Sequence, residues 1–297
     1  MSYNIYCARN GLVLFLVIAS SIYTSNARAQ SGGTVKLSVT DARPVAAAVM
    51  ELVSRYGYLI TYEDPRHMYQ DDLEDVTSKV RRDLDKYPPG MAPKVIVPST
   101  ATLTLDIPSA SAITAQDMAA VLAQLMQAQS STGRGGHFRV QRSGDEFHVL
   151  PTEFRDQNGN WIEETSILEV PISMPLEDRS ADGMINAICK AVSAAGHVKM
   201  GLAFSVGGIS SPSNPRPYRF GADNERARDV LMRALNLLGA NQSRTWVLFF
   251  DPSNLSGYPY VLTIRNVPKR LSTPLATVAS PKTLPNSPGP AVAPPNK

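Results

Sequence analysis

The side chains best suited to chemistry in this 297-residue chain are its four histidines, two cysteines and pairs of adjacent acids. The histidines are His67, His137, His148 and His197. His137 and His148 fall on the two strands of a predicted hairpin and could supply two metal ligands. A zinc site needs at least three protein ligands, so exposed strand histidines are the preferred interpretation.

The acidic pairs Glu63-Asp64 and Glu163-Glu164 consist of adjacent residues. Neighbours on an extended chain point to opposite sides, so neither pair can share a proton as a catalytic dyad does. Cys189 lies one turn from apolar residues of a predicted helix and is expected to be a small buried hydrophobe rather than a nucleophile.

Two further motifs carry weaker signals. The loop Gly133–Gly136 follows a predicted helix and precedes a strand, whereas a phosphate-binding loop follows a strand and opens a helix. The acids Asp71, Asp72, Glu74 and Asp75 lack the spacing and glycine of a calcium loop, so they are assigned to a helix N-terminus. With no serine-hydrolase elbow and no zinc-protease motif either, we nominate no catalytic, cofactor-binding or metal residue, and expect no enzyme.

The N-terminus predicts export. An apolar run, Gly11–Ile22, follows Arg9 and precedes Ala27-Arg28-Ala29, which places a signal peptide at 1–29. A retained membrane anchor is the alternative, but the run is short for a bilayer span. We therefore expect a protein of the periplasm or outer envelope with no transmembrane span after cleavage. Its net charge of +3 gives no electrostatic reason to invoke nucleic acid.

The first half of the chain predicts a strand–helix–strand unit followed by a second one and a hairpin. Pro44 suits the first turn of its first helix and Gly57 the left-handed position after that helix. Thr114 and Asp117 form a capping box for the second helix. The predicted strands are Val35–Thr40, Tyr58–Tyr62, Ala101–Ile107, His137–Gln141 and Phe147–Leu150.

The second half predicts the same order of elements. A helix runs from about Asp182 to Ala195 and ends at Gly196, and Asp223 or Asn224 caps a second helix that ends at Gly239. The predicted strands are Ile167–Ile172, Met200–Val206, Tyr218–Gly221, Trp246–Phe250 and Tyr260–Ile264. The last two form a hairpin.

These patterns predict an α+β fold of two small β-α-β-β-α-β-β domains in tandem, at 30–156 and 161–267. The first carries an insertion, Arg66–Pro98, in which apolar residues from Leu73 to Tyr87 predict a solvated amphipathic helix. The helix-ending glycines of the first half are further apart than those of the second by the length of this insertion. Residues 268–297 are rich in proline, contain no acids, and predict a disordered basic tail.

The stretch Leu37–Pro44, the helix after it and Tyr56–Tyr62 resemble the short N-terminal domain of secretins and TonB-dependent receptors. The closing strand, helix and hairpin of the second half are similar to the same family more faintly. The resemblance implies two diverged copies of a binding module without catalytic residues or cofactors. The insertion, and the lack of a secretin or receptor barrel, depart from the family and put a role in secretion or signalled transport in doubt.

We expect a non-catalytic envelope protein that acts as a protein-interaction module, with a homodimer as one form. A small-ligand carrier or sensor that binds between the domains is the alternative, and an enzyme with an unrecognised site is the third hypothesis. Trp246–Phe250 is expected to be a central strand. Its hairpin partner could instead offer an open edge to another strand, a hypothesis that places the Thr263 N–H on that edge.

Overall fold

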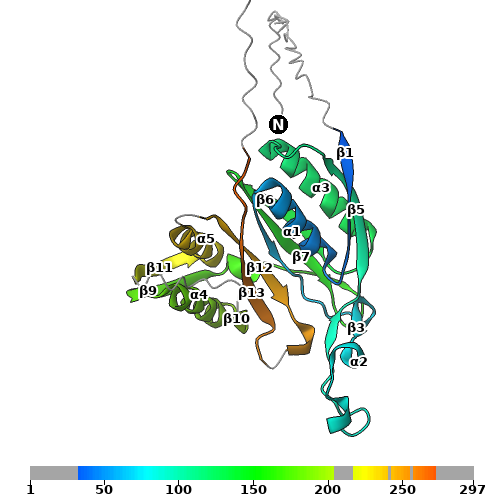
Figure 1. Cartoon of the computed structure of the whole chain (residues 1–297). Helices are drawn as coiled ribbons and strands as arrows, with labels where there is room; N and C mark the ends of the chain where they lie inside the picture. The colour runs from blue at the N-terminus through cyan, green and yellow to red at the C-terminus, as the bar shows by residue number, and fades with distance from the viewer. Residues whose placement is uncertain (1–32, 204–216, 240–241, 255–256, 272–297) are drawn as a thin grey trace, which may run out of the picture. The chain divides into compact units, whose positions relative to one another are not determined.

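The computed structural model describes residues 33–203, 217–239, 242–254 and 257–271, and confirms the predicted α+β class (Figure 1). The predicted signal peptide, most of the tail and the end of the expected strand Met200–Val206 lie outside these residues. None of the helices in the described ranges is both long enough and apolar enough to cross a membrane.

The first half opens with β1 (Thr34–Asp41), α1 (Pro44–Tyr56) and β2 (Leu59–Glu63), as predicted. It continues with β5 (Ala101–Pro108), α3 (Ala115–Ser131), β6 (His137–Ser143) and β7 (Glu146–Arg155). Helix α3 begins with the expected capping box, in which Thr114 and Asp117 bind each other's backbone N–H groups. A short strand, β8 (Trp161–Glu163), pairs with β7.

The second half contains β9 (Pro171–Arg179), α4 (Ala181–Ala195), β10 (Met200–Leu202), β11 (Tyr218–Arg226), α5 (Ala227–Leu238), β12 (Arg244–Phe250) and β13 (Tyr260–Asn266). Two predictions of element boundaries are wrong here. Ile167–Glu169 is a 3-10 turn, not a strand, because the Ser166 hydroxyl accepts the Leu168 N–H. Strand β11 runs on to Arg226, so neither Asp223 nor Asn224 caps α5.

The two halves pair their strands in the same order. Each has a two-stranded antiparallel ribbon, β1–β5 or β9–β11. In the first half β2 pairs with β7 in parallel and β7 with β6 antiparallel; β10, β13 and β12 repeat this order. Strand β12 then pairs in parallel with β2, which joins the two sets into the sheet order β10-β13-β12-β2-β7-β6.

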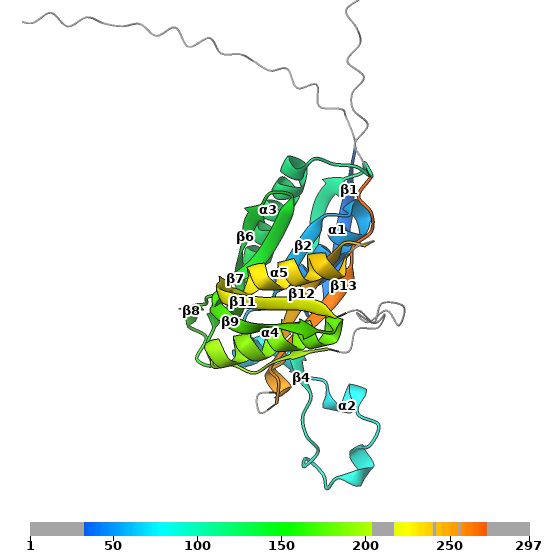
Figure 2. The same ribbon diagram turned by 90° about the vertical axis from the view of Figure 1, so that its left-hand side faces the viewer.

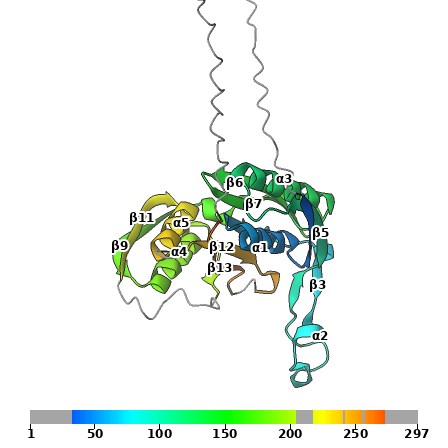
Figure 3. The same ribbon diagram turned by 45° about the horizontal axis from the view of Figure 1, so that its top comes forward.

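Two hydrophobic cores lie on opposite faces of this sheet. Helices α4 and α5 lie on one side of it and α1 and α3 on the other (Figures 2 and 3). Along β12 the side chains alternate, so that Trp246, Leu248 and Phe250 enter the core with α4 and α5. Val247 enters the core with α1 and α3, and Phe249 packs against it. The sheet therefore crosses the expected boundary between the halves, and two independent tandem domains stay a prediction.

The predicted helix in the insertion is wrong. The segment forms a hairpin of β3 (Leu73–Asp75) and β4 (Ile96–Pro98), with only a four-residue helix, α2 (Thr77–Val80), and a 3-10 turn at its far end. Val80 is 56% exposed, so the apolar stripe has no core to pack on, and helix propensity alone does not hold a short helix. Residues 66–72, by contrast, include the buried His67 and Asp72 and belong to the fold.

The beginning of the predicted disordered tail is packed against the first half. Arg270 donates to the Asp145 carboxylate at 2.9 Å, and its guanidinium lies 3.9 Å from the Tyr58 ring centre. Gly57 has φ +67°, and a Cβ there would lie 2.8 Å from the Pro268 carbonyl oxygen. Only glycine combines this left-handed turn with so close an approach of the chain.

Candidate functional site

The structure separates the two histidines that the sequence placed on one hairpin. His137 pairs across the ladder with Glu153, and His148 with Gln141. His137 Nδ1 lies 2.6 Å from Glu153 Oε2, and its ring stacks on Trp161. His148 is buried, not exposed as predicted. Burial and the charge of Arg228 lower the pKa of His148 to about 4, so the ring is neutral at physiological pH.

The other candidate residues are similarly assigned to structure. Cys189 is buried, as expected, and burial raises the pKa of its thiol to about 12, which leaves too little thiolate for nucleophilic attack. The acidic cluster does not begin the expected amphipathic helix: Asp72 forms an ion pair with Arg155, Glu74 and Asp75 lie in β3, and Asp75 accepts the Thr77 N–H at the start of the short helix α2. No three His, Cys, Asp or Glu side chains in the described part gather as metal ligands would.

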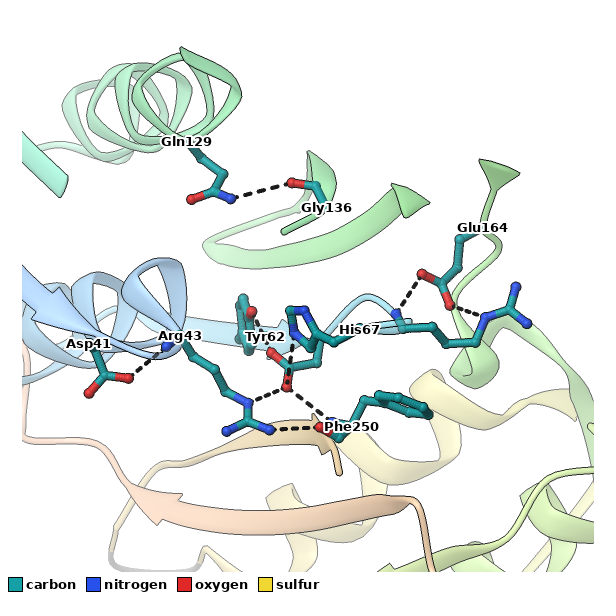
Figure 4. A network of polar contacts seen from close by, with 10 residues as sticks. Asp41, Arg43, Tyr62, His67, Gln129, Gly136, Glu164 and Phe250 are labelled. Carbon is teal, nitrogen blue, oxygen red and sulfur yellow. Dashed lines mark hydrogen bonds and ion pairs between the residues drawn. The ribbon is translucent and has the colours of Figure 1, made fainter. Parts of the chain in front are cut away.

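A buried polar network lies at the end of β2 (Figure 4). Its centre is Asp64, whose carboxylate accepts Arg43 Nε at 2.5 Å, the Tyr62 hydroxyl at 2.6 Å and the Phe250 backbone N–H at 3.0 Å. Burial alone would raise the pKa of Asp64, but the adjacent Arg43 guanidinium and these hydrogen bonds hold it below its usual value. The carboxylate is therefore ionised.

The chain positions this network at three element ends. Asp41 Oδ1 accepts the Arg43 N–H just before α1, Asp64 follows β2, and Phe250 ends β12. Arg43 Nη2 also donates to the Phe250 carbonyl at 2.7 Å, and the Asp64 N–H to the Leu248 carbonyl at 2.8 Å. Asp64 thus holds β12 of the second half against α1 and β2 of the first.

Glu63 has a separate set of partners on the other side of β2, as expected for adjacent strand residues. The Ser166 hydroxyl donates to Oε2 at 2.5 Å and the Ile167 N–H to Oε1 at 2.8 Å. Burial raises the pKa of Glu63 to about 8, so its proton is retained near neutrality. Nearby, Glu164 accepts hydrogen bonds from the backbone N–H and from Nε of Arg66. Glu63 and Glu164 thus fix the connection between the halves at two points.

A small cavity adjoins Asp64. It has about 30 Å³ of free space and is lined in part by Arg43, Tyr62, His67 and Gln129. His67 Nε2 lies 3.9 Å from Asp64 Oδ2, and neither this nitrogen nor Gln129 Oε1 has a hydrogen-bond partner within the described ranges. A space of that size holds about one water molecule and no organic substrate. The network is therefore suited to holding the fold rather than to turnover.

An open groove lies between α5 and the strands β6 and β7. It encloses about 700 Å³, with Gln141 and His148 on the sheet side and Arg226, Arg228 and Arg233 on the helix side. Arg228 is 2% exposed and its Nη1 lies 2.8 Å from Glu169 Oε1 and 3.3 Å from Gln141 Oε1. Burial lowers the pKa of Arg228, an effect that Glu169 opposes. Arg226 and Arg233 also have acidic partners, so the groove is polar but its charges are balanced.

Strand β6 is the end of the seven-stranded sheet and has no strand on its outer side in the described part of the chain. It turns into β7 through Gly144-Asp145, and Gly144 has φ +61°, as a two-residue hairpin with glycine first requires. Such a hairpin closes on a hydrogen-bonded pair, here Ser143 and Glu146. The backbone groups of Phe138, Val140 and Arg142 consequently face the free edge.

The expected edge at Tyr260–Ile264 is wrong. Strand β12 is central, as predicted, but β13 is itself covered by β10 over Met200–Leu202. The Asp251 N–H donates to the Pro259 carbonyl and the Val267 N–H to the Ser243 carbonyl, so every second residue of β13 faces β12. Thr263 belongs to this inward set, and proline there would break the ladder rather than test an edge.

No family model, curated protein or solved structure matches the chain. The resemblance to the secretin and receptor domain therefore stays a sequence-based expectation. Sequence reasoning considered Asp64 only as half of a dyad and missed Arg43 and Phe250 altogether. One signal was available in the sequence. Arg43 directly precedes the helix and Asp64 directly follows the second strand of the same predicted strand–helix–strand unit.

Proposed function

We propose that this protein is a non-catalytic, exported component of the cell envelope that binds a partner protein through an unpaired strand edge. The observation that carries the proposal is β6, a seven-residue strand at the end of a sheet whose outer edge has no partner among the described residues. An open edge offers a row of backbone donors and acceptors to an added strand. The leader-like sequence at 1–29 is the support for export.

Site-specific photo-crosslinking in the native cell tests this proposal. A photoreactive residue at position 142, on the free edge, should give a discrete protein adduct in the envelope fraction. The same residue at position 82, exposed in the insertion, is the matched control and should give none. Absence of an adduct from positions 139 and 142 alike would contradict the proposal.

A second function is favoured by the groove between α5 and β6–β7, whose volume of about 700 Å³ matches that of small-molecule sites. In this alternative the protein carries or senses a small ligand between its halves. Thermal-shift screening of the mature chain against small metabolites tests it. A hit should lose its effect in Met232→Trp, which narrows the groove, and a hit unaffected by that change would place the ligand elsewhere.

A further inference from the structure

The occupied and the free edges of the sheet are topologically equivalent. The left-handed residues after the first helix of each half, Gly57 and His197, align β2 with β10. Ile60 then matches Met200, and their parallel partners Phe147 and Tyr260 match each other. Following the antiparallel ladders, Val140 of β6 corresponds to Leu248 of β12. Strand β12 pairs with β2 along one of its edges. The equivalent edge of β6 has no partner strand among the described residues.

The side chains of β6 and β12 differ on the face that packs against the other half when β12 pairs with β2. On β12, the residues that face away from their own core are Val247 and Phe249, which pack against the core of the first half. Their counterparts on β6 are Arg139 and Gln141, in that order. A second copy of this chain that docked as the halves do would need apolar side chains there, and would instead bury an amide and a guanidinium.

The free edge is cationic. Arg139 is exposed and has no ion pair among the residues that the structure describes. Arg142 is exposed, and its Nη2 is 4.0 Å from the nearest carboxylate, that of Asp145. Asp145 already accepts a hydrogen bond from Arg270, and Glu153 binds His137, so these two acids near the edge have partners. The edge therefore favours a ligand that brings its own carboxylates.

We propose that the β6 edge binds an extended acidic segment of a partner protein, which adds an eighth strand to the sheet. Its backbone pairs with Phe138, Val140 and Arg142. Its carboxylates lie beside Arg139 on one face of the sheet and beside Arg142 on the other. The partner strand therefore needs acidic residues at both odd and even positions along it. This inference rests on the proposed function and specifies the chemistry of the partner.

Neither the C-terminal tail nor strand β10 of a second copy fits this role. Residues 272–297 contain no aspartate or glutamate, so the tail cannot supply the carboxylates. Strand β10 of a second copy would bring Met200, Gly201 and Leu202 with Lys199 beside them, and no acid. An acidic strand from another protein is the occupant that matches both the backbone edge and the charge.

Synthetic peptides added to the full mature chain test the inference. The probe is a ten-residue peptide in which glutamate occupies most positions, interspersed with threonine and valine, and its control has glutamine for every glutamate. At low ionic strength the acidic peptide should bind about tenfold more tightly, by fluorescence anisotropy. Arg139→Glu should weaken its binding about tenfold. Arg82→Glu, the same charge change in the insertion, should leave it unchanged.

Backbone pairing has its own signature. On peptide binding, the amides of Phe138, Val140 and Arg142 should gain protection from hydrogen exchange, whereas those of Arg139 and Gln141 already face β7. Arg142→Pro, which removes an outward N–H, should weaken binding several-fold more than Arg142→Ala, which keeps it. Circular dichroism of both variants verifies that the fold is retained.

Three results would overturn the inference. Equal binding of the glutamine peptide, with the alternating protection intact, would show an edge that ignores charge and would leave the proposed function standing. Charge-dependent binding without protection of these amides would show surface attraction alone. Self-association of the chain by sedimentation, abolished by Arg142→Pro, would make a second copy the occupant. The crosslinking experiment decides the proposed function separately.

Discussion

Strands β6 and β12 hold the same place in the two halves of this protein, yet one is an edge and the other is central. The difference lies in the side chains that face away from each strand's own core. Val247 and Phe249 make β12 apolar on both faces, whereas Gln141 and Arg139 make β6 apolar on one face only. The two halves share one strand arrangement. The side chains of these few residues distinguish the strand that pairs with the other half from the strand that is left as an edge.

The largest effect should come from breaking the join at Asp64. Asp64→Asn leaves Arg43 without its anion and weakens the acceptor of the Phe250 N–H, so we expect a loss of about 3–5 kcal/mol in unfolding free energy. Urea denaturation followed by circular dichroism measures it. Asp83→Asn removes a partly exposed carboxylate of the insertion that also pairs with an arginine, and should leave the midpoint unchanged. Equal midpoints for both variants would refute the assigned role of Asp64.

Exchanging valine and glutamine between the faces of β12 and β6 that point away from their own cores should give unequal results. Val247→Gln buries an amide between the halves and should cost about 3 kcal/mol. Gln141→Val on β6 removes only a 3.3 Å hydrogen bond from Arg228 and should cost about 1 kcal/mol. Chemical denaturation of the two variants side by side makes the comparison. Similar losses would mean that β6 is covered as β12 is.

The pH dependence of stability should report Glu63, which lies beside the join. Its pKa of about 8 exceeds the unfolded value, so the folded state holds an extra proton and stability falls as pH rises towards 8. The lowered pKa of His148 has the opposite effect between about 4 and 6.5. From pH 6.5 to 8 we therefore expect a net loss on the order of 1–2 kcal/mol. Thermal unfolding across this range should show the loss, and Glu63→Gln should flatten it.

The smallest effect should come from the insertion, which the first half alone carries within the described ranges. Replacing residues 76–95 by Asn-Gly closes the β3–β4 hairpin after Asp75 and should alter stability by about 0.5 kcal/mol or less. Deleting the whole stretch 66–98 also removes the contacts of Arg66 with Glu164 and of Asp72 with Arg155. Calorimetry should find this larger deletion much the more destabilising, and equal effects would contradict the revised boundary.

Local signals predicted much of the fold. Pro44, Gly57 and the Thr114–Asp117 box act within a few residues of themselves, so the limits of α1 and the start of α3 follow from sequence. The sequence predicts a helix in the insertion because apolar residues recur there at helical spacing. That spacing does not show whether any surface of the fold packs against them. The turn at Ile167 was mispredicted because its backbone is held by Glu63, about a hundred residues away.

The candidate site was largely beyond sequence reasoning for the same reason. Arg43, Asp64 and Phe250 come from widely separated parts of the chain, and two of the groups that bind Asp64 and Arg43 are backbone atoms of Phe250. No side-chain motif encodes a backbone partner. The pKa of His148 is lowered by burial and also by the charge of Arg228, which comes from the other half of the chain.

Arg270 clamps the end of the described chain to Tyr58 and Asp145, and this clamp has a mechanical consequence. Strand β13 belongs to the second half, but the chain leaving it is tied to Tyr58 and Asp145 of the first. A pull on the C-terminal tail would load this clamp before it could peel β13 away from β12 one hydrogen bond at a time. Arg270 is therefore the point at which such a force would enter the fold.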